Sequence, residues 1–161
     1  KRFEAGEYFL PELIISGEMF SQISAMAKPL LKTDENREFV GKVLIGTVEG
    51  DVHDLGKNIV TFMLEVNGLE VLDLGVDVPA DRFVEAIREF KPSVVGLSGL
   101  LTLAYDAMKV TVEAIGAAGL RDGIVIIIGG ASIDERVREY TGADHYGPDA
   151  LAAVSLAKNH I

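Results

Sequence analysis

From Lys42 onward, strand-like and helix-like segments alternate five times, and this alternation constrains the fold more than any other feature of the chain. The strand-like segments are 43–48, 70–74, 93–97, 124–128 and 143–146, and the helix-like segments are 57–67, 79–90, 101–118, 132–140 and 148–159. Residues 124–128 are consecutive β-branched residues, a run typical of a strand that is buried on both faces. The pattern predicts an α/β fold, namely a flavodoxin-like, five-stranded parallel doubly wound sheet with strand order 2-1-3-4-5.

The first 32 residues have a different pattern. Apolar residues recur at helical spacing from Phe3 to Leu30, and Pro11 suits the first turn of a helix. Two short helices cannot bury so wide an apolar stripe alone, so they need a partner surface. We therefore expect a separate helical unit in 1–32, a polar linker in 33–41 and a Rossmann-like domain in 42–161. The stripe also favours a homodimer formed through these helices.

Composition excludes several classes of function. A formal net charge of -10 disfavours nucleic acid and anionic membranes as partners, because both require clustered Lys and Arg. The absence of cysteine excludes disulfides, thiol catalysis and thiolate metal sites. No apolar run approaches the roughly 20 residues that a membrane span requires. We expect a soluble, cytoplasmic protein.

Unusual residues collect after the strands, at the sheet edge where an open α/β fold binds its ligands. After the first strand, Asp51 precedes His53 by two residues. Such a carboxylate can hold one ring N–H while the other ring nitrogen faces a metal or an electrophile. Glycines after the third and fourth strands, including Gly129 and Gly130, would let a flat ligand approach the backbone closely.

Other chemistries of this fold match the residues less well. Zinc would need three or four ligands, and the only other histidines are His145, expected at a strand end, and His160, expected in a solvated tail. A phosphate-accepting receiver domain needs an Asp after the third strand, where Ser98 stands. The acidic first loop would repel the phosphate of a flavin mononucleotide. Neither a nucleophile elbow nor a phosphate-binding P-loop is present in the sequence.

Three motifs together resemble the cobalamin-binding proteins, whose pattern is Asp-x-His-x-x-Gly, then Ser-x-Leu, then Gly-Gly. They stand in this order as Asp51-Val-His53-Asp-Leu-Gly56, Ser98-Gly-Leu100 and Gly129-Gly130. The first 32 residues resemble the last helices of the cap in methyl-transferring members, such as methionine synthase and the corrinoid proteins of methanol, methylamine and O-demethylase systems. Mutases that use adenosylcobalamin share the motifs but lack this cap. The resemblance thus implies that residues 1–32 are a partial helical-bundle cap.

The resemblance implies a cofactor, cobalamin in its methyl form or a related corrinoid, bound with its nucleotide base off the cobalt. His53 would be the lower axial cobalt ligand and Asp51 its partner, and these two residues would carry the chemistry. Phe3 and Leu10 match positions where the cap covers the upper methyl face. The residues expected to contact the cofactor are Gly50, Asp51, Val52, His53, Asp54, Leu55, Gly56, Ser98, Leu100, Thr102, Gly129, Gly130, Ala131, Tyr146, Asp149, Ala150, Phe3 and Leu10.

One position departs from the methionine synthase pattern, which extends the His-Asp pair with a hydroxyl six residues after the serine. Ala104 stands there in this chain. The third member of the relay is therefore absent or supplied elsewhere, for instance by water. We predict that the protonation of Asp51 is less tightly coupled and that the lower-ligand equilibrium is less sensitive to pH.

The function implied by the resemblance is that of a non-catalytic carrier, which passes a methyl group between a substrate-side and an acceptor-side methyltransferase and requires a reductive activator. Among methyl donors we favour O-methyl ethers, with methanol and methylamines as alternatives, and tetrahydrofolate or a thiol as acceptor. A cobalamin-dependent sensory module is the main rival. A flavodoxin-like interaction domain without a cofactor is the third.

Overall fold

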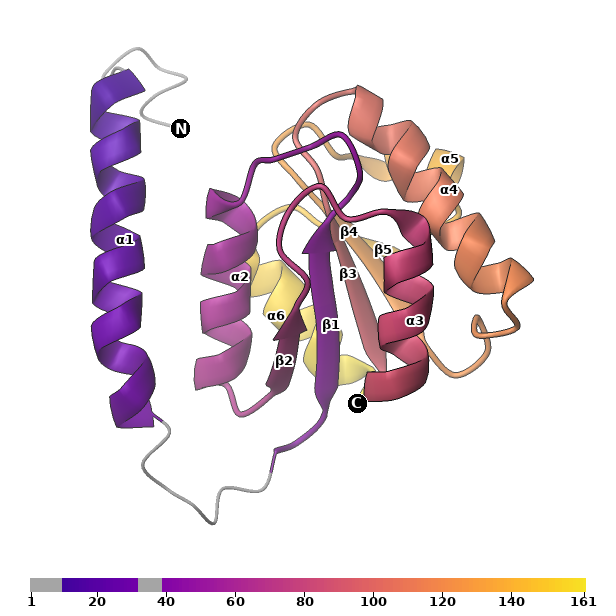
Figure 1. Ribbon diagram of the computed structural model, residues 1–161, viewed down its shortest axis with the longest axis horizontal. Coiled ribbons are helices and arrows are strands. Elements are labelled where there is room, and N and C mark those ends of the chain that lie inside the picture. The colour runs from indigo at the N-terminus through magenta and orange to yellow at the C-terminus, as the bar shows by residue number, and fades with distance from the viewer. Residues whose placement is uncertain (1–9, 32–38) are drawn as a thin grey trace. The chain divides into compact units, whose positions relative to one another are not determined.

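The computed structural model describes residues 10–31 and 39–161, and the chain divides into two compact units, Lys1–Arg37 and Glu38–Ile161 (Figure 1). In the first unit the described residues form one continuous helix, α1 (Leu10–Leu31), rather than two short ones. Pro11 is its second residue, as expected. In the described part of the chain, no helix combines the length and the apolar character needed to cross a bilayer.

The second unit is built on a parallel sheet whose order, β2-β1-β3-β4-β5, confirms the predicted doubly wound topology. Its strands are β1 (Lys42–Thr47), β2 (Glu70–Asp73), β3 (Val94–Ser98), β4 (Val125–Gly129) and β5 (His145–Gly147). The chain reverses direction along the sheet between β1 and β3, so the loops that follow these two strands lie side by side. A fold of this kind binds its ligands in the crevice at that point.

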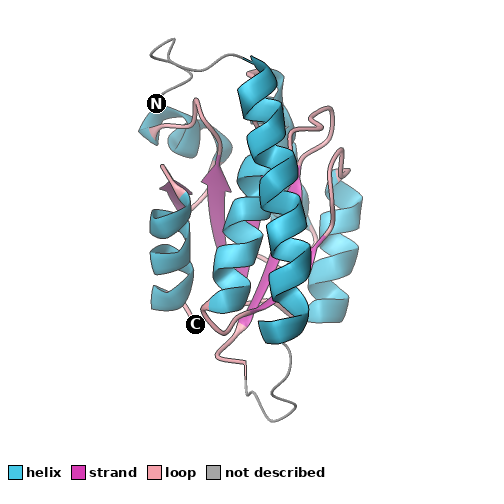
Figure 2. Cartoon of the chain, turned by 90° about the vertical axis from the view of Figure 1, so that its left-hand side faces the viewer, coloured by secondary structure: helices cyan, strands magenta, loops and turns pink. Residues whose placement is uncertain are grey.

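Helices lie on both sides of the strands (Figures 1 and 2). They are α2 (Leu55–Val66), α3 (Ala80–Phe90), α4 (Leu103–Ala117), α5 (Glu135–Thr141) and α6 (Ala150–Asn159). Each lies within a few residues of its predicted place. The largest difference is at α5, which begins three residues later than predicted because Asp134 caps it and accepts hydrogen bonds from the N–H groups of Arg136 and Val137.

Alternate residues of the strands point into two separate hydrophobic clusters. On one face, Val95 packs with Phe83 and Met108 from α3 and α4. On the other face, the neighbouring residue Val94 packs with Leu64 of α2 and with α6. The sheet is therefore buried on both faces, as residues 124–128 predict. The second face, under α2 and α6, also contains a cavity.

Candidate functional site

The His53 ring lies at the carboxyl edge of the sheet, in the loop between β1 and α2. Its Nδ1 atom is 2.6 Å from Oδ1 of Asp51, and the backbone N–H of His53 donates to the same oxygen at 2.9 Å. An ionised carboxylate can only accept, so Nδ1 carries the hydrogen and the neutral ring presents Nε2 with its lone pair. The His53 side chain is 47% exposed, and no hydrogen bond within the described residues engages Nε2. The ring is therefore held through Nδ1, and Nε2 is available to bind a ligand.

Asp51 is fully enclosed, with 1% of its surface exposed, and it is held by four hydrogen bonds. Its second oxygen, Oδ2, accepts the backbone N–H groups of Leu100 at 2.7 Å and Leu101 at 3.0 Å. Burial alone would raise the pKa of the Asp51 carboxyl, but the hydrogen bonds from Leu101, His53 and Leu100 outweigh it and lower the pKa to about 2. The group is thus a permanent carboxylate at neutral pH.

No side-chain hydroxyl at position 104 reaches Asp51. Ala104 is buried beside Gly99, and a Cβ built on Gly99 would lie 2.5 Å from the Ala104 Cβ. The second oxygen of Asp51 instead accepts the two backbone N–H groups at the start of the β3–α4 loop. These amides hold the carboxylate in place, and a water molecule as the third member of the relay stays a prediction.

A third loop, which follows β2, also holds the histidine loop. The backbone N–H of Asp77 donates to the carbonyl of Asp51 at 2.9 Å, and the Asp77 carboxylate accepts the N–H of Gly50 at 2.7 Å. Asp77 has a φ of 54°, a left-handed conformation that Asp tolerates better than most residues. The buried Thr47 hydroxyl adds a bond to the carbonyl of His53 at 3.0 Å. Neither Thr47 nor Asp77 was predicted as a site residue. Gly75 and Asp77 nevertheless are residue types that favour turns and mark such a loop.

Beside the histidine loop, a cavity of about 300 Å³ lies between the sheet and the helices α2 and α6. Its floor consists of residues of β1, β3 and β4. Its lining is mostly aliphatic or glycine, and it comprises Val43, Ile45, Gly56, Lys57, Ile59, Val60, Leu64, Val94, Gly96, Leu97, Ser98, Ile127, Ile128, Gly129, Gly130, Ala131, Gly147, Pro148, Asp149, Ala150, Ala153 and Ala157. Such a space suits a flat, largely apolar group.

Glycines shape this cavity in different ways. A Cβ built on Gly56 would meet no protein atom within 4 Å, and one on Gly129 would meet only the Gly147 carbonyl at 3.7 Å, so both leave the cavity open. Gly56 is the second residue of α2 and is not among the glycines with positive φ, so backbone conformation does not require a glycine there. Gly130 is needed for packing instead, because its Cβ would collide with the Gly99 carbonyl.

The structure brings part of the predicted site together on the cavity. The predicted residues that line it are Gly56, Ser98, Gly129, Gly130, Ala131, Asp149 and Ala150. Gly50, Val52, Asp54, Leu55, Leu100 and Thr102 lie on the loops and helix starts at the same sheet edge. Tyr146 does not line the cavity, since it packs against the hydrophobic cluster on the other face of the sheet. Phe3 lies outside the described residues, and Leu10 is the first residue of α1 in the other unit.

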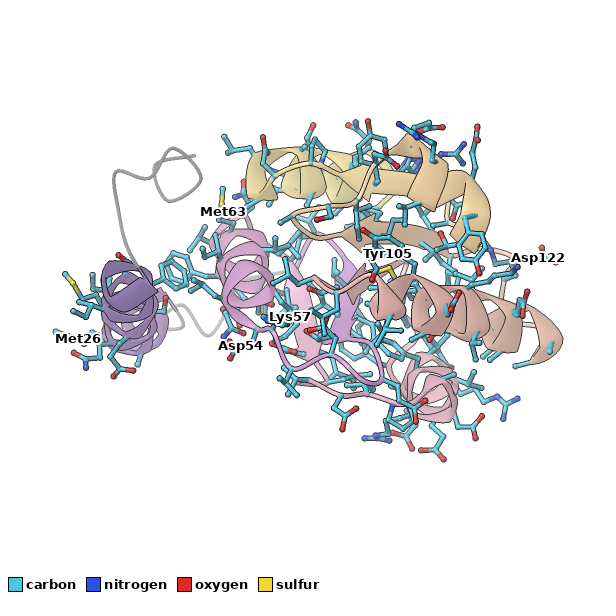
Figure 3. All side chains as sticks on the ribbon, turned by 90° about the horizontal axis from the view of Figure 1, so that it is seen from above. Met26, Asp54, Lys57, Met63, Tyr105 and Asp122 are labelled. Atoms are coloured by element: carbon cyan, nitrogen blue, oxygen red, sulfur yellow. The ribbon has the colours of Figure 1, made fainter. Side chains whose placement is uncertain are left out.

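Most of the other cavity residues were not predicted as site residues, and two of them, Gly96 and Lys57, are informative. Gly96 stands alone within the strand-like run 93–97, and an isolated glycine in a strand often marks the close approach of a ligand. Lys57 is buried on α2, where its ammonium binds Asp73 Oδ2 at 2.5 Å and Asn58 Oδ1 at 2.9 Å. Seen from above, Lys57 points from α2 toward the strands (Figure 3). No sequence pattern distinguishes this lysine from a surface lysine.

The other histidines lie away from this edge. His145 is the first residue of β5, and its ring stacks on His160 with centroids 4.9 Å apart. His160 follows the end of α6 and is exposed, as expected for a tail residue, and its ring also contacts His145.

The protein has a doubly wound sheet and a histidine that a carboxylate holds beside an apolar cavity. These features define a cofactor-binding protein of the α/β class. Comparison with known proteins identifies its family. A family model described as the B12 binding domain matches residues 41–155. The dimethylamine corrinoid protein of Methanosarcina barkeri is 38% identical over 157 residues, which cover 98% of this chain and 74% of that relative. A solved structure described as a novel cobalamin-binding protein from Desulfitobacterium hafniense DCB-2 is 43% identical with a TM-score of 0.74, covering 99% of this chain and 75% of that one.

A third similarity is to a chain in the crystal structure of the methanol:cobalamin methyltransferase complex MtaBC from Methanosarcina barkeri. It is 30% identical with a TM-score of 0.73, and the match covers 98% of this chain and 60% of that one. The protein belongs to the B12-binding family, and its cofactor is cobalamin or a related corrinoid. The resemblance expected from the three motifs is confirmed.

Proposed function

We propose that the protein is a corrinoid carrier that holds a methyl group between methyltransferase partners and completes no reaction alone. The observation that carries this proposal is the available Nε2 of His53 next to the apolar cavity. When bound, the corrinoid supplies a cobalt centre that accepts and gives up a methyl group.

His53 would hold the cobalt from below through Nε2, since imidazole is a good ligand for a borderline metal. Asp51 would fix the ring as the tautomer with hydrogen on Nδ1 and raise the basicity of Nε2. Because hydrogen bonds lower the pKa of the Asp51 carboxyl to about 2, this support would persist across the physiological pH range. The Asp51–His53 pair would thus set how firmly the cobalt is held.

The cavity would hold the nucleotide tail of the corrinoid. The base of this tail is flat and apolar, which matches the glycines Gly96 and Gly129 on the floor and the aliphatic walls. Ser98 lines the cavity at the carboxyl end of β3, and its hydroxyl has no hydrogen-bond partner among the described residues. This hydroxyl could donate to the base nitrogen that has left the cobalt.

The loops around His53 would hold the corrin ring. Large apolar side chains are exposed there, among them Val52 at 67% and Leu101 at 43%. Exposed apolar residues gathered beside a ligand-ready side chain indicate a surface that a ligand covers. Leu100 and Thr102, in the same β3–α4 loop, would complete this surface.

The names of the relatives support a methylamine as the methyl donor, because a dimethylamine corrinoid protein is 38% identical over nearly the whole chain. The O-methyl ether donor and the tetrahydrofolate acceptor stay predictions without such support. The similarity to a chain of a methanol:cobalamin methyltransferase complex supports a substrate-side methyltransferase as one partner. The reductive activator, and the cover that Phe3 and Leu10 would give to the methyl face, remain predictions.

The visible absorption spectrum tests the proposal. We expect the protein mixed with methylcobalamin to show a base-off spectrum with a histidine ligand, and the histidine signature to disappear in His53→Ala. His160→Ala, which removes a histidine stacked on His145 away from the loop, is the matched control and should keep the signature. A base-on spectrum identical to that of free methylcobalamin would contradict the proposal. Light-dependent assembly with adenosylcobalamin would favour the sensory module.

A further inference from the structure

We propose that Lys57 is a positioning residue for His53, because its buried ion pair with Asp73 fixes the start of α2 and, with it, the second half of the histidine loop, residues 48–54. This inference rests on the proposed function, since it takes His53 as the cobalt ligand. It adds a residue, outside the loop itself, that sets how much of the bound cofactor keeps its histidine ligand.

His53 is held from two directions along the chain. On the side of β1, the Thr47 hydroxyl and the Asp51 carboxylate bond it directly. On the other side, only Asp54 separates it from α2. The Asp54 carbonyl accepts the backbone N–H of Asn58 at 2.7 Å, and the Asp54 carboxylate accepts the Asn58 side-chain N–H at 3.1 Å. The position of the imidazole therefore depends on where the first turn of α2 lies.

Lys57 is an unusual residue for its place in the first turn of α2. Its side chain is only 2% exposed, whereas lysines are almost never buried to this extent unless they are paired. A cation near the N-terminus of a helix also opposes the helix dipole, and the first turn of α2 carries no acidic residue that would offset it. The stability of the helix alone therefore gives no reason for a lysine at this position.

The ammonium of Lys57 joins α2 to the end of β2. It binds Asp73 Oδ2 at 2.5 Å and Asn58 Oδ1 at 2.9 Å. Asn58 in turn bonds Asp54, the residue that follows the histidine. The other oxygen of Asp73 accepts the N–H of Gly75 at 2.9 Å. One chain of bonds thus runs from the β2–α3 loop through Lys57 to the end of the histidine loop.

The β2–α3 loop, residues 74–79, consequently holds the histidine loop at both of its ends. Asp77 within it bonds the first half of the histidine loop, and Asp73 at its start holds the second half through Lys57. A buried ion pair adds little net stability compared with apolar side chains of the same size, and its advantage is that it favours one geometry. Here that geometry is the place of the first turn of α2 relative to β2.

Loss of the Lys57 ammonium would free this turn without removing any atom from His53 or Asp51. Replacement of a residue that orients a metal ligand typically changes metal affinity by roughly 10- to 100-fold. Lys57 acts one step further away, through Asn58 and the helix. We therefore expect the lower end of that range, a fall of roughly 10-fold in the ratio of histidine-bound to histidine-free cofactor.

The test is a pH titration of the visible spectrum of the whole chain saturated with methylcobalamin, for the parent protein and for Lys57→Met. Methionine keeps an unbranched side chain but lacks the ammonium. A proton competes with cobalt for Nε2 of His53, so a weaker cobalt–nitrogen bond is lost at a higher pH. In Lys57→Met we expect the pH at which half of the bound cofactor has lost the histidine signature to rise by about one unit, which corresponds to a tenfold change. An unchanged titration would overturn the inference and leave the carrier proposal intact.

Arg121→Met is the matched control. It removes an ion pair with Asp144 at the opposite edge of the sheet, where β4 and β5 begin. We expect it to leave the titration unchanged, even where it lowers the thermal stability as much as Lys57→Met does. An equal shift in both variants would mean that general loss of stability is the cause. Weaker binding of methylcobalamin by Lys57→Met with an unchanged titration would mean that Lys57 contacts the cofactor directly. Either result would overturn the inference.

Asp73→Asn tests the same ion pair from its other side, and it carries the test if Lys57→Met does not fold. Asparagine keeps the size and one acceptor oxygen but not the charge, so we expect a smaller rise of about half a pH unit, or about 3-fold. Because both residues act through one contact, the variant with both changes should shift the titration no further than Lys57→Met alone. Additive shifts, or no shift in Asp73→Asn, would contradict the inference. A parent protein that shows no histidine signature at any pH would overturn the proposed function as well.

Discussion

The carboxylate of Asp51 accepts the backbone N–H of Leu100 at 2.7 Å, across 49 positions of sequence, and so joins the loop after β1 to the loop after β3. Together with Leu101, this contact occupies the oxygen that does not face His53. Backbone amides do not release protons near neutral pH, so a network that ends in them orients the histidine without relaying a proton. This arrangement supports the expectation, drawn from Ala104, that the lower-ligand equilibrium responds weakly to pH.

The low pKa of Asp51 predicts how stability depends on pH. Its folded-state pKa of about 2 lies below the ordinary value of 3.8, so its contribution is fully present above about pH 4 and is lost as the pH falls toward 2. A shift of this size corresponds to about 2 kcal/mol. Asp51→Asn should therefore lose about that much free energy of unfolding at pH 7, and the difference from the parent protein should shrink as the pH approaches 2. Urea unfolding at several pH values measures this.

The control for that experiment is Asp122→Asn, which removes an exposed carboxylate and should change the free energy of unfolding by less than about 0.5 kcal/mol. A constant difference between Asp51→Asn and the parent protein from pH 7 down to pH 2 would mean that the Asp51 charge contributes nothing to the folded state.

Asp77 should position the histidine loop through its acceptor oxygen. Asp77→Ala removes the bond to Gly50, which is worth roughly 1–2 kcal/mol, so we expect cobalamin binding to weaken about 10-fold and the histidine-bound fraction to fall. Asp77→Asn keeps both the acceptor and the tolerance of positive φ, and should stay within about 3-fold of the parent protein. Asp77→Gly relieves the backbone but lacks the acceptor, so it should resemble Asp77→Ala. If Asp77→Gly instead binds like the parent protein, backbone conformation and not the hydrogen bond is what matters.

Two glycine variants should separate binding from folding. Gly56→Ala adds a methyl group in open space within α2, so it should keep or raise stability, by up to about 1 kcal/mol, while it weakens cobalamin binding. Gly130→Ala collides with the Gly99 carbonyl and should destabilise the fold by about 1–3 kcal/mol. Thermal unfolding without cofactor and calorimetric titration with it distinguish the two effects. Unchanged binding in Gly56→Ala would show that no ligand fills this part of the cavity.

The apolar stripe of α1 should drive self-association. Ile15, Met19, Ile23 and Met26 recur on one side of this helix, and each is more than half exposed. We expect a homodimer in solution, and replacement of Ile15 and Ile23 by Gln should yield monomers without loss of fold. Glu18→Gln, a change on the same helix outside the stripe, is the control. Light scattering that gives a monomeric mass for the parent protein at micromolar concentration would contradict this prediction.

The sequence predicted the sheet because its signals are local and agree with one another. The β-branched run 124–128 and the stop at Gly119 place β4 and α4 within a few residues of their observed positions. The first residue of α5 was harder to predict, because Ser132 and Asp134 are both residue types that commonly cap the N-terminus of a helix. The observed bonds to Asp134 decide it.

The site was harder to predict because much of it arises from long-range backbone contacts. The amides of Leu100 and Leu101 carry no residue-type signal, and neither does the bond from Asp77 to the Asp51 carbonyl. The sequence shows where the glycines stand but not why each position requires a glycine. Gly56 and Gly129 leave space for a ligand, whereas Gly130 leaves space for the backbone of Gly99. Only the packed structure separates these uses.

Electron paramagnetic resonance of the cobalt(II) form tests the central claim most directly, which is that His53 Nε2 binds the metal from below. Protein in which histidine alone carries nitrogen-15 should show the two-line splitting of a nitrogen-15 nucleus, and His53→Ala should lose it. A spectrum with the three-line splitting of the cofactor's own nitrogen-14 base, or with no nitrogen splitting, would contradict the account.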